Sequence, residues 1–367
     1  MISDDTLTRL RTALRHSPRF AGPDPEALEP LPTTGLAHDH VRIRGTGLLL
    51  RVPKQSQLAL DAARNLDYQA ACFARASASG HAPRLHGVLE PSADLPLGAL
   101  VVDEIAGRPP VLPDDLPALA RALAAIHALP LPPAADRPPL KDQADPVAGT
   151  LDEVRRQAVH LDAAGLDAEA LAQIREELAR AEAFAAAAPE AGPVPTALIS
   201  FDAHPGNFLI EPDGRAVLVD LEKARYGAPG YDLAHATLYT STTWDVAVYA
   251  ELTPEQTAAF HDAWRAALPP AVAEAARPWL LPLRRIMWLW SVTWCAKWRV
   301  QSRAAARART GDTISAEDWS AELSRPELVA HVRGRVADYL DPDTIMRVRA
   351  DWRGDHAFTD LVSRPWA

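Results

Sequence analysis

The sequence predicts an α+β fold, with strands and helices in different parts of the chain. Short apolar runs typical of buried strands lie at 36–43, 47–52, 83–88 and 99–102. Longer segments rich in Ala, Leu, Glu and Arg, typical of helices, lie at 116–129, 150–160, 167–188, 254–268 and 279–309. Further short strands at 196–200, 208–210 and 216–219 interrupt the helices and include one tight hairpin.

The two ends of the chain are predicted to be largely helical. Helices at 3–14 and 57–79 flank a Pro-rich segment at 18–32, which leads into the first strands. Near the other end, we expect Pro282 to break off the first turn of the long helix, because proline lacks the N–H that a helix interior needs. We expect residues 352–367 to be irregular.

The most informative stretch begins with the strand that ends at Ser200. That strand delivers Asp202 onto a loop, which a Pro-Gly pair keeps out of a helix. Asn207 follows five residues after Asp202, and a hairpin with a Pro-Asp-Gly turn then leads to Asp220. The hairpin therefore predicts that two carboxylates and one carboxamide lie close together.

These side chains fit phosphoryl-transfer chemistry. Mg²⁺ prefers carboxylate and amide oxygens, with phosphate and water completing its coordination. Phosphoryl transfer uses one Asp to orient the attacking hydroxyl, and an Asn and a second Asp to hold the metal. The pattern D-x4-N, strand, turn, strand, D resembles the aminoglycoside phosphotransferase and choline kinase family, a branch of the protein-kinase-like fold. The sequence Tyr231-Asp232-Leu233-Ala234 resembles the Y-D-L-A segment of that family.

The resemblance covers residues 32–240 and implies a two-lobed protein-kinase-like fold. Residues 1–103 would form a β-rich nucleotide-binding lobe, and residues 104–367 a helical catalytic and substrate lobe. The resemblance also implies ATP and Mg²⁺ as cofactors. In that case Asp202 is the catalytic base, and Asn207 and Asp220 are the metal ligands.

The same resemblance assigns further residues to nucleotide binding. Arg51 lies where the family has the basic residue that holds the α- and β-phosphates, and Gly35 lies in the place of the phosphate-covering loop. Glu104 and Ile105 occupy the hinge, whose backbone groups would contact adenine. The family pairs its basic residue with a Glu on the next helix, and Gln69 lies near that place here.

Departures from the family pattern keep two other functions open. Ser200 replaces the family His two residues before the catalytic Asp, and no Glu occupies the family position on the predicted helix. A nucleotide-binding protein without catalysis is therefore one alternative. The other is a metal-dependent hydrolase that uses Asp202, His204, Asp220 and His235 and needs no nucleotide.

The composition favours some partners and locations over others. Of the 367 residues, 23% are charged and 48% hydrophobic, which is typical of a globular protein. The net charge of −10 argues against a nucleic-acid partner, which needs a basic surface. Cys72 and Cys295 are the only cysteines, which predicts a reducing, cytoplasmic location. No apolar run reaches 18 residues and the first residues lack a signal-peptide core, so we expect no membrane span.

Three tryptophans suggest where a substrate binds. Trp290, Trp294 and Trp298 recur at every fourth position and so share one face of a predicted helix. Core packing between helices explains this stripe without any ligand. Alternatively, the indole faces attract a cation, and the acidic chain raises the local concentration of cations. On that basis we expect a small-molecule substrate, a hydroxylated amine or an amino sugar.

Overall fold

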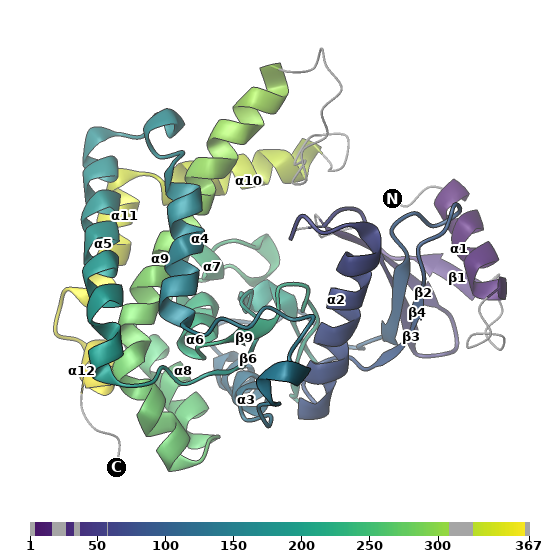
Figure 1. Ribbon diagram of the computed structural model, residues 1–367, viewed down its shortest axis with the longest axis horizontal. Helices are drawn as coiled ribbons and strands as arrows, with labels where there is room; N and C mark the ends of the chain where they lie inside the picture. The colour runs from purple at the N-terminus through teal and green to yellow at the C-terminus, as the bar shows by residue number, and fades with distance from the viewer. Residues whose placement is uncertain (1–3, 17–26, 33–36, 57, 308–325, 364–367) are drawn as a thin grey trace.

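The computed structural model describes residues 4–16, 27–32, 37–56, 58–307 and 326–363. Figure 1 shows two parts, a β-sheet with two helices on the right and a larger, mostly helical body on the left. None of the helices in these ranges is both long and apolar enough to cross a membrane.

Five antiparallel strands form the N-terminal sheet, in the order β1-β2-β3-β5-β4. Their bounds are β1 Leu28–Pro30, β2 His38–Ile43, β3 Leu48–Pro53, β4 Leu85–Leu89 and β5 Ala99–Asp103. Four of them confirm predicted strands. Strand β1 was not predicted, because it lies inside the Pro-rich lead-in and ends at Pro30, a residue that sheets admit mainly at their edges.

A helix covers each face of this sheet. Val101 belongs to the cluster that contains α1 (Asp4–His16), whereas its neighbours Leu100 and Val102 pack with α2 (Ala62–Ala76), because successive strand residues point to opposite faces. Helix α2 begins later than predicted because the Asp61 side chain caps it, accepting a hydrogen bond from the N–H three residues on.

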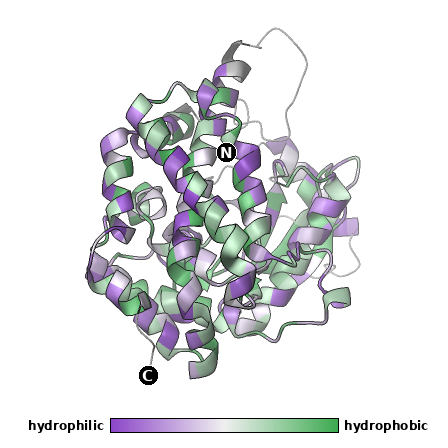
Figure 2. Ribbon diagram, turned by 60° about the vertical axis from the view of Figure 1, so that its left-hand side comes forward, coloured by the Kyte–Doolittle hydropathy of each residue, from purple (hydrophilic) through white to green (hydrophobic). Residues whose placement is uncertain are grey.

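The helical part is organised around one long helix. Its elements are α3 Leu116–His127, α4 Pro146–Ala158, α5 Ala168–Ala187, α6 Gly230–Thr237, α7 Tyr239–Thr242, α8 Pro254–Ala266, α9 Pro270–Arg307, α10 Pro326–Tyr339, α11 Pro342–Arg349 and α12 Ala357–Ser363. Helix α9 has 38 residues and packs against α4, α5, α6 and α10 (Figure 1). Most helices in Figure 2 carry hydrophilic and hydrophobic residues side by side, as helices with one buried face do.

Two predictions about this part are wrong. Helix α9 does not break at Pro282 but starts before it and continues through both Pro278 and Pro282. Each proline removes one N–H donor, so only the carbonyls four residues before Pro278 and Pro282 lose their helical partner, and the chain stays helical on both sides. Residues 357–363 are not irregular but form α12, because Phe358 and Val362 are buried against α8 and α9.

Two short sheets carry the loop that contains Asp202. Strand β6 (Ala197–Ile199) pairs antiparallel with β9 (Arg225–Gly227), and β7 (Phe208–Ile210) pairs antiparallel with β8 (Ala216–Leu218). The β7–β8 hairpin confirms the prediction. Strand β9 was not predicted, because Arg-Tyr-Gly is not an apolar run, and it forms only because β6 offers it a partner.

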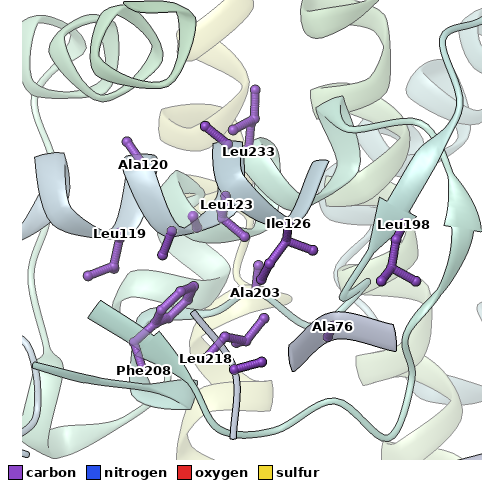
Figure 3. Close-up of a cluster of buried hydrophobic side chains, with 14 of the residues drawn as sticks. Ala76, Leu119, Ala120, Leu123, Ile126, Leu198, Ala203, Phe208, Leu218 and Leu233 are labelled. Carbon is purple, nitrogen blue, oxygen red and sulfur yellow. The ribbon is translucent and has the colours of Figure 1, made fainter. Parts of the chain in front are cut away.

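Helix α3 packs against the hairpin. Figure 3 shows Leu119, Leu123 and Ile126 of α3 close to Phe208 and Leu218 of the hairpin. All five side chains are at most 1% exposed. Burial of such a side chain contributes about 1.5–3 kcal/mol. The hairpin and the loops at its ends are therefore held rigidly against the helical part.

Candidate active site

The turn that precedes Asp202 has a strained backbone. Phe201 has a φ of 58°, in the left-handed region that non-glycine residues rarely adopt. Its ring is fully buried, and the guanidinium carbon of Arg225 lies 3.7 Å from the ring centre. The Asp202 N–H donates to the Ser200 hydroxyl at 3.2 Å. Such strain persists only where surrounding contacts hold it, and it is common at functional sites.

Asp232 of α6 holds this turn in place. Its carboxylate accepts the N–H of Ser200 at 2.8 Å and the N–H of Phe201 at 2.7 Å. A third donor is His127 Nε2 at 3.1 Å, and Nδ1 of the same ring accepts the indole N–H of Trp264 at 3.0 Å. Since an indole N–H can only donate, Nε2 of His127 carries a proton toward Asp232. The Y-D-L-A segment thus supplies the residue that anchors the loop.

The structure brings Asp202, Asn207 and Asp220 to one place. The Asn207 side-chain NH₂ donates to the backbone carbonyl of Asp202 at 2.8 Å. The backbone carbonyl of Asn207 accepts the N–H of Val219, the residue before Asp220, at 2.8 Å. All three side chains line the same cavity. Because its nitrogen is bound to the loop, the Asn207 amide leaves its oxygen for another partner.

Two cationic or potentially cationic groups face the Asp202 carboxylate. Lys223 Nζ lies 2.8 Å from Oδ2, and His235 Nδ1 lies 3.7 Å from Oδ1. Burial raises the pKa of Asp202, but Lys223, then His235 and His204, more than offset it, so the pKa lies below its ordinary value. Burial lowers the pKa of His235 to about 4. Asp202 is therefore an ionised carboxylate beside a neutral imidazole at neutral pH.

Arg51 of β3 is buried and ion-paired. Its Nη2 lies 2.6 Å from Asp220 Oδ1, and its Nη1 donates to the carbonyl of Val219 at 3.2 Å. Its Nη2 also donates to Nδ1 of His38 at 3.2 Å, and Nε2 of that ring lies 3.0 Å from Gln69 Oε1. Arg can only donate, so Nδ1 accepts and the Nε2–H bonds Gln69. The helix partner that the sequence left unassigned is thus Gln69, acting through His38.

The carboxylates around Arg51 have different pKa values. Burial raises the pKa of Asp220, but Arg51, His38 and Lys223 outweigh burial and hold it well below its ordinary value. Burial, and then the charge of Asp220, raise the pKa of Glu222 to about 8. Glu222 Oε2 lies 3.7 Å from His38 Nε2. At neutral pH Asp220 is therefore charged and Glu222 is largely protonated.

A cavity of about 780 Å³ joins these residues to an aromatic wall. Trp290 and Trp294 line it with Trp244, whose ring packs edge-on against Trp294 at 5.8 Å. Trp298, in contrast, is only 4% exposed and belongs to the hydrophobic core, so core packing explains its position. Further lining residues are Asp202, His204, Asn207, Asp220, Lys223, His235, Thr240, Ser241, Asp245, Glu327, His331 and Tyr339.

Arg51, Glu104 and Ile105 are not among the described residues that line this cavity. The Glu104 side chain pairs with Arg42 Nε at 2.5 Å, and its backbone N–H donates to the carbonyl of Gly47 at 2.8 Å. The carbonyl of Ile105 accepts the N–H of Gly107 at 3.1 Å. Gly35 lies outside the described residues.

The sequence did not reveal the roles of Lys223, His38 and Asp232. For Lys223, its place three residues after Asp220 is the signal that could have indicated a role in the site. In the structure His38 links Arg51 to Gln69, and no pattern in the sequence indicates that link.

The donor set fits a magnesium nucleotide. Asp220 offers a carboxylate and Asn207 an amide oxygen, and Mg²⁺ on a nucleotide usually takes only one or two protein ligands beside phosphate and water. Over the described ranges, no group of three or more His, Cys, Asp or Glu side chains is placed to hold a metal by itself. His204 does face the cavity, and its Nδ1 accepts the N–H of Gly206 at 3.1 Å.

Comparison with known proteins gives both a family and a fold. The model of a phosphotransferase enzyme family, APH, matches residues 32–279. A choline/ethanolamine kinase family protein from Mesorhizobium loti superposes with a TM-score of 0.55, at 18% identity over 98% of each chain. A choline kinase from Cryptosporidium parvum gives 0.56, at 14% identity over 98% of this chain and 100% of that one.

A third structure, the GDP complex of an aminoglycoside 2′-phosphotransferase, also gives a TM-score of 0.56, at 14% identity over 90% of this chain and 96% of that one. Among curated proteins, the sequence has no significant match. At these identities the structural likeness concerns the fold, and it confirms the predicted protein-kinase-like architecture.

Proposed function

Since this chain belongs to the phosphotransferase enzyme family, we propose that it transfers the γ-phosphoryl group of ATP, with Mg²⁺, to a small amine-bearing substrate. The protein is thus a phosphotransferase whose acceptor is an alcohol group. The observation that carries the proposal is that Asp202, Asn207 and Asp220 line the same cavity as the indole rings of Trp244, Trp290 and Trp294.

Asp202 is proposed as the base. Lys223 holds its Oδ2, so Oδ1 is the oxygen left to accept the proton of the substrate hydroxyl. The low pKa of Asp202 means that it is ionised and ready to accept at neutral pH. The strained turn at Phe201 fixes the backbone from which this carboxylate extends, and the ion pair with Lys223 fixes its Oδ2.

Asn207 and Asp220 are proposed to hold Mg²⁺, which would neutralise charge on the phosphates. Arg51 is proposed to hold the α- and β-phosphates. Its Nε–H has no hydrogen-bond partner among the described residues, so one buried donor is left for a ligand. Glu104 and Ile105 are proposed to contact adenine through backbone groups.

The acceptor half of the cavity favours a cation with hydroxyl groups. Trp244, Trp290 and Trp294 present indole rings, each worth about 0.5–2 kcal/mol to a cation. Asp245 and Glu327 add two carboxylates to the same wall. A substrate amine would therefore be attracted to these rings and carboxylates, with its hydroxyl toward Asp202.

The nucleotide half of the proposal is tested by isothermal titration. The wild type should bind ATP in the presence of Mg²⁺ and more weakly in EDTA. Asp220→Ala should weaken binding strongly and Asn207→Ala more mildly, because each removes a proposed metal ligand. Unchanged affinity in Asp220→Ala would show that this loop does not hold a magnesium nucleotide.

The acceptor is then sought with a panel of hydroxylated amines, neutral sugars and nucleosides, assayed for ADP release. Binding is followed by Trp fluorescence in Trp290→Phe, Trp294→Phe and the matched control Trp298→Phe, whose indole is buried in the core. The amine signal should diminish in the first two variants and persist in the third. Preferential turnover of a neutral sugar would refute the hypothesis of an amine-bearing substrate, but it would not contradict the proposed kinase activity. Tight ATP binding without turnover of any acceptor would favour the non-catalytic alternative.

A further inference from the structure

Lys223 occupies a distinctive place in the cavity. It is the only lysine or arginine among the described residues that line the cavity. Its Nζ lies 2.8 Å from Asp202 Oδ2 and 5.8 Å from the centre of the Trp290 ring. Only two residues separate it from Asp220 in the chain. The ammonium group therefore lies beside the proposed base, on the segment that carries the proposed metal ligand.

Arg51 cannot occupy the position of Lys223. Arg51 approaches from the sheet, where its guanidinium is committed to Asp220, to the carbonyl of Val219 and to His38. It also lies over the ring of Phe73, 5.3 Å from the ring centre. Arg51 is thus bound to Asp220 and to the residue before it, and it is not among the described residues that line the cavity. A phosphoryl group that is transferred to an acceptor bound at Asp202 would therefore contact Lys223 rather than Arg51.

The ammonium group of Lys223 is charged, and only one of its N–H donors is bound to Asp202. Burial lowers the pKa of Lys223, but the carboxylates of Asp202, Glu222 and Asp220 outweigh burial and raise it above its ordinary value. A lysine ammonium has three N–H donors. Asp202 takes one of them. The remaining donors can bind phosphate oxygens without breaking the contact to the base.

We propose that Lys223 is a further catalytic residue, which binds an oxygen of the γ-phosphoryl group of ATP while its ammonium stays paired with Asp202. This inference rests on the proposed function. During transfer, a lone pair of the acceptor oxygen forms the new O–P bond and the acceptor proton passes to Asp202 Oδ1. The bond between γ-phosphorus and the β,γ-bridging oxygen breaks, and ADP leaves with that electron pair. Lys223 neutralises the charge on the transferring oxygens and keeps Oδ2 of the base from repelling them.

The experiment compares MgATP with MgADP, since only the first has a γ-phosphoryl group. Dissociation constants are measured by titration calorimetry for the wild type, Lys223→Met and Lys223→Arg. Arg121→Met is the charge-matched control, because that residue is exposed on α3 and is not among the cavity-lining residues. Lys223→Met should weaken MgATP about tenfold, the value of one hydrogen bond to a charged group, and change MgADP less than about twofold. Lys223→Arg should recover part of the loss, and Arg121→Met should show none.

Removal of Lys223 alone also exposes ATP to the uncompensated charge of Asp202, so a second background is needed. Asp202→Asn and Asp202→Asn/Lys223→Met form that background, and the double variant buries no unpaired charge. If Lys223 binds the γ-phosphoryl group, its removal still weakens MgATP about tenfold when Asp202 is already Asn. An equal MgATP affinity in these two variants would show that Lys223 only neutralises Asp202 and would overturn the inference. Absence of MgATP binding by the wild type would instead refute the proposed function itself.

Discussion

Asp232→Asn tests whether one buried carboxylate holds the turn that precedes Asp202. Asp232 is fully buried, and its two oxygens accept three hydrogen bonds, from the N–H groups of Ser200 and Phe201 and from His127. An Asn has one acceptor oxygen and an NH₂ group of almost the same shape. If its oxygen faces Ser200 and His127, its NH₂ meets the N–H of Phe201, and two donors then face each other.

The size of the effect follows from these contacts. A buried donor left without an acceptor costs about 1–3 kcal/mol. The two remaining hydrogen bonds lose the assistance of the negative charge and become weaker. A neutral amide is cheaper to bury than a carboxylate, which offsets part of this cost. We therefore expect Asp232→Asn to lower the free energy of unfolding by about 2 kcal/mol.

The assay is urea unfolding followed by circular dichroism, with Asp162→Asn as the control. Asp162 is a 74% exposed carboxylate paired with Arg175, so its loss should cost less than about 0.5 kcal/mol. Phe201 would also lose the contact that holds its positive φ, so Asp202 would move and turnover should fall with stability. A destabilisation by Asp232→Asn no larger than that of the control would refute the anchoring role of Asp232.

Three further predictions concern other parts of the molecule. Asp202→Asn should lower turnover at least about a hundredfold with little change in ATP affinity, since the proposed general base is lost. Gln69→Leu should weaken MgATP about fivefold, because the His38 Nε2–H loses its acceptor and Arg51 is held less firmly. His261→Gln should reduce the slope of the unfolding free energy against pH in the acidic range. Burial lowers the pKa of His261 to about 3 from an ordinary value of 6.5, so between these values the unfolded chain binds a proton that the native chain does not. Stability is thus lost as the pH falls, by up to about 1.4 kcal/mol per pH unit for this residue.

Each of these predictions has a result that contradicts it. Full turnover in Asp202→Asn would remove this carboxylate from the mechanism. Gln69→Glu keeps an acceptor for His38, so an equal loss in Gln69→Glu and Gln69→Leu would exclude the relay. For His261, the slope of unfolding free energy against pH is measured between pH 4 and 6.5. An unchanged slope in His261→Gln would mean that this histidine is protonated in the native state.

Local sequence patterns predicted the centre of the site. Asp202, Asn207 and Asp220 lie at the ends of short strands joined by a tight turn, so their proximity depends only on pairing within one hairpin. The main helices were predictable for a similar reason, because their periodicity is repeated over many residues. The resemblance to a kinase family then supplied the two-lobed arrangement, which the comparisons confirm.

Partners from distant parts of the chain were not predictable. The acceptor of the His38 Nε2–H is Gln69, which lies 31 residues away on a different element, and Asp232 reaches back 32 residues to the turn. Their proximity depends on how α2 packs on the sheet and how α6 packs beside β6, and neither packing leaves a periodic mark in the sequence. Short elements such as β9 and α12 exist because a neighbour buries them, so their own residues give little signal.

Helix α9 limits how this enzyme can acquire new substrates. Its Trp290 and Trp294 line the cavity, while Trp288 and Met287, on the same turns, are fully buried in the core. A replacement on the cavity side of α9 therefore also alters the packing that stabilises the helical part. The segment at 245–248 lines the same cavity, but its Val246 is 76% exposed. Divergence of acceptor preference is expected to begin in that segment, where mutations alter the wall of the cavity without loosening the scaffold.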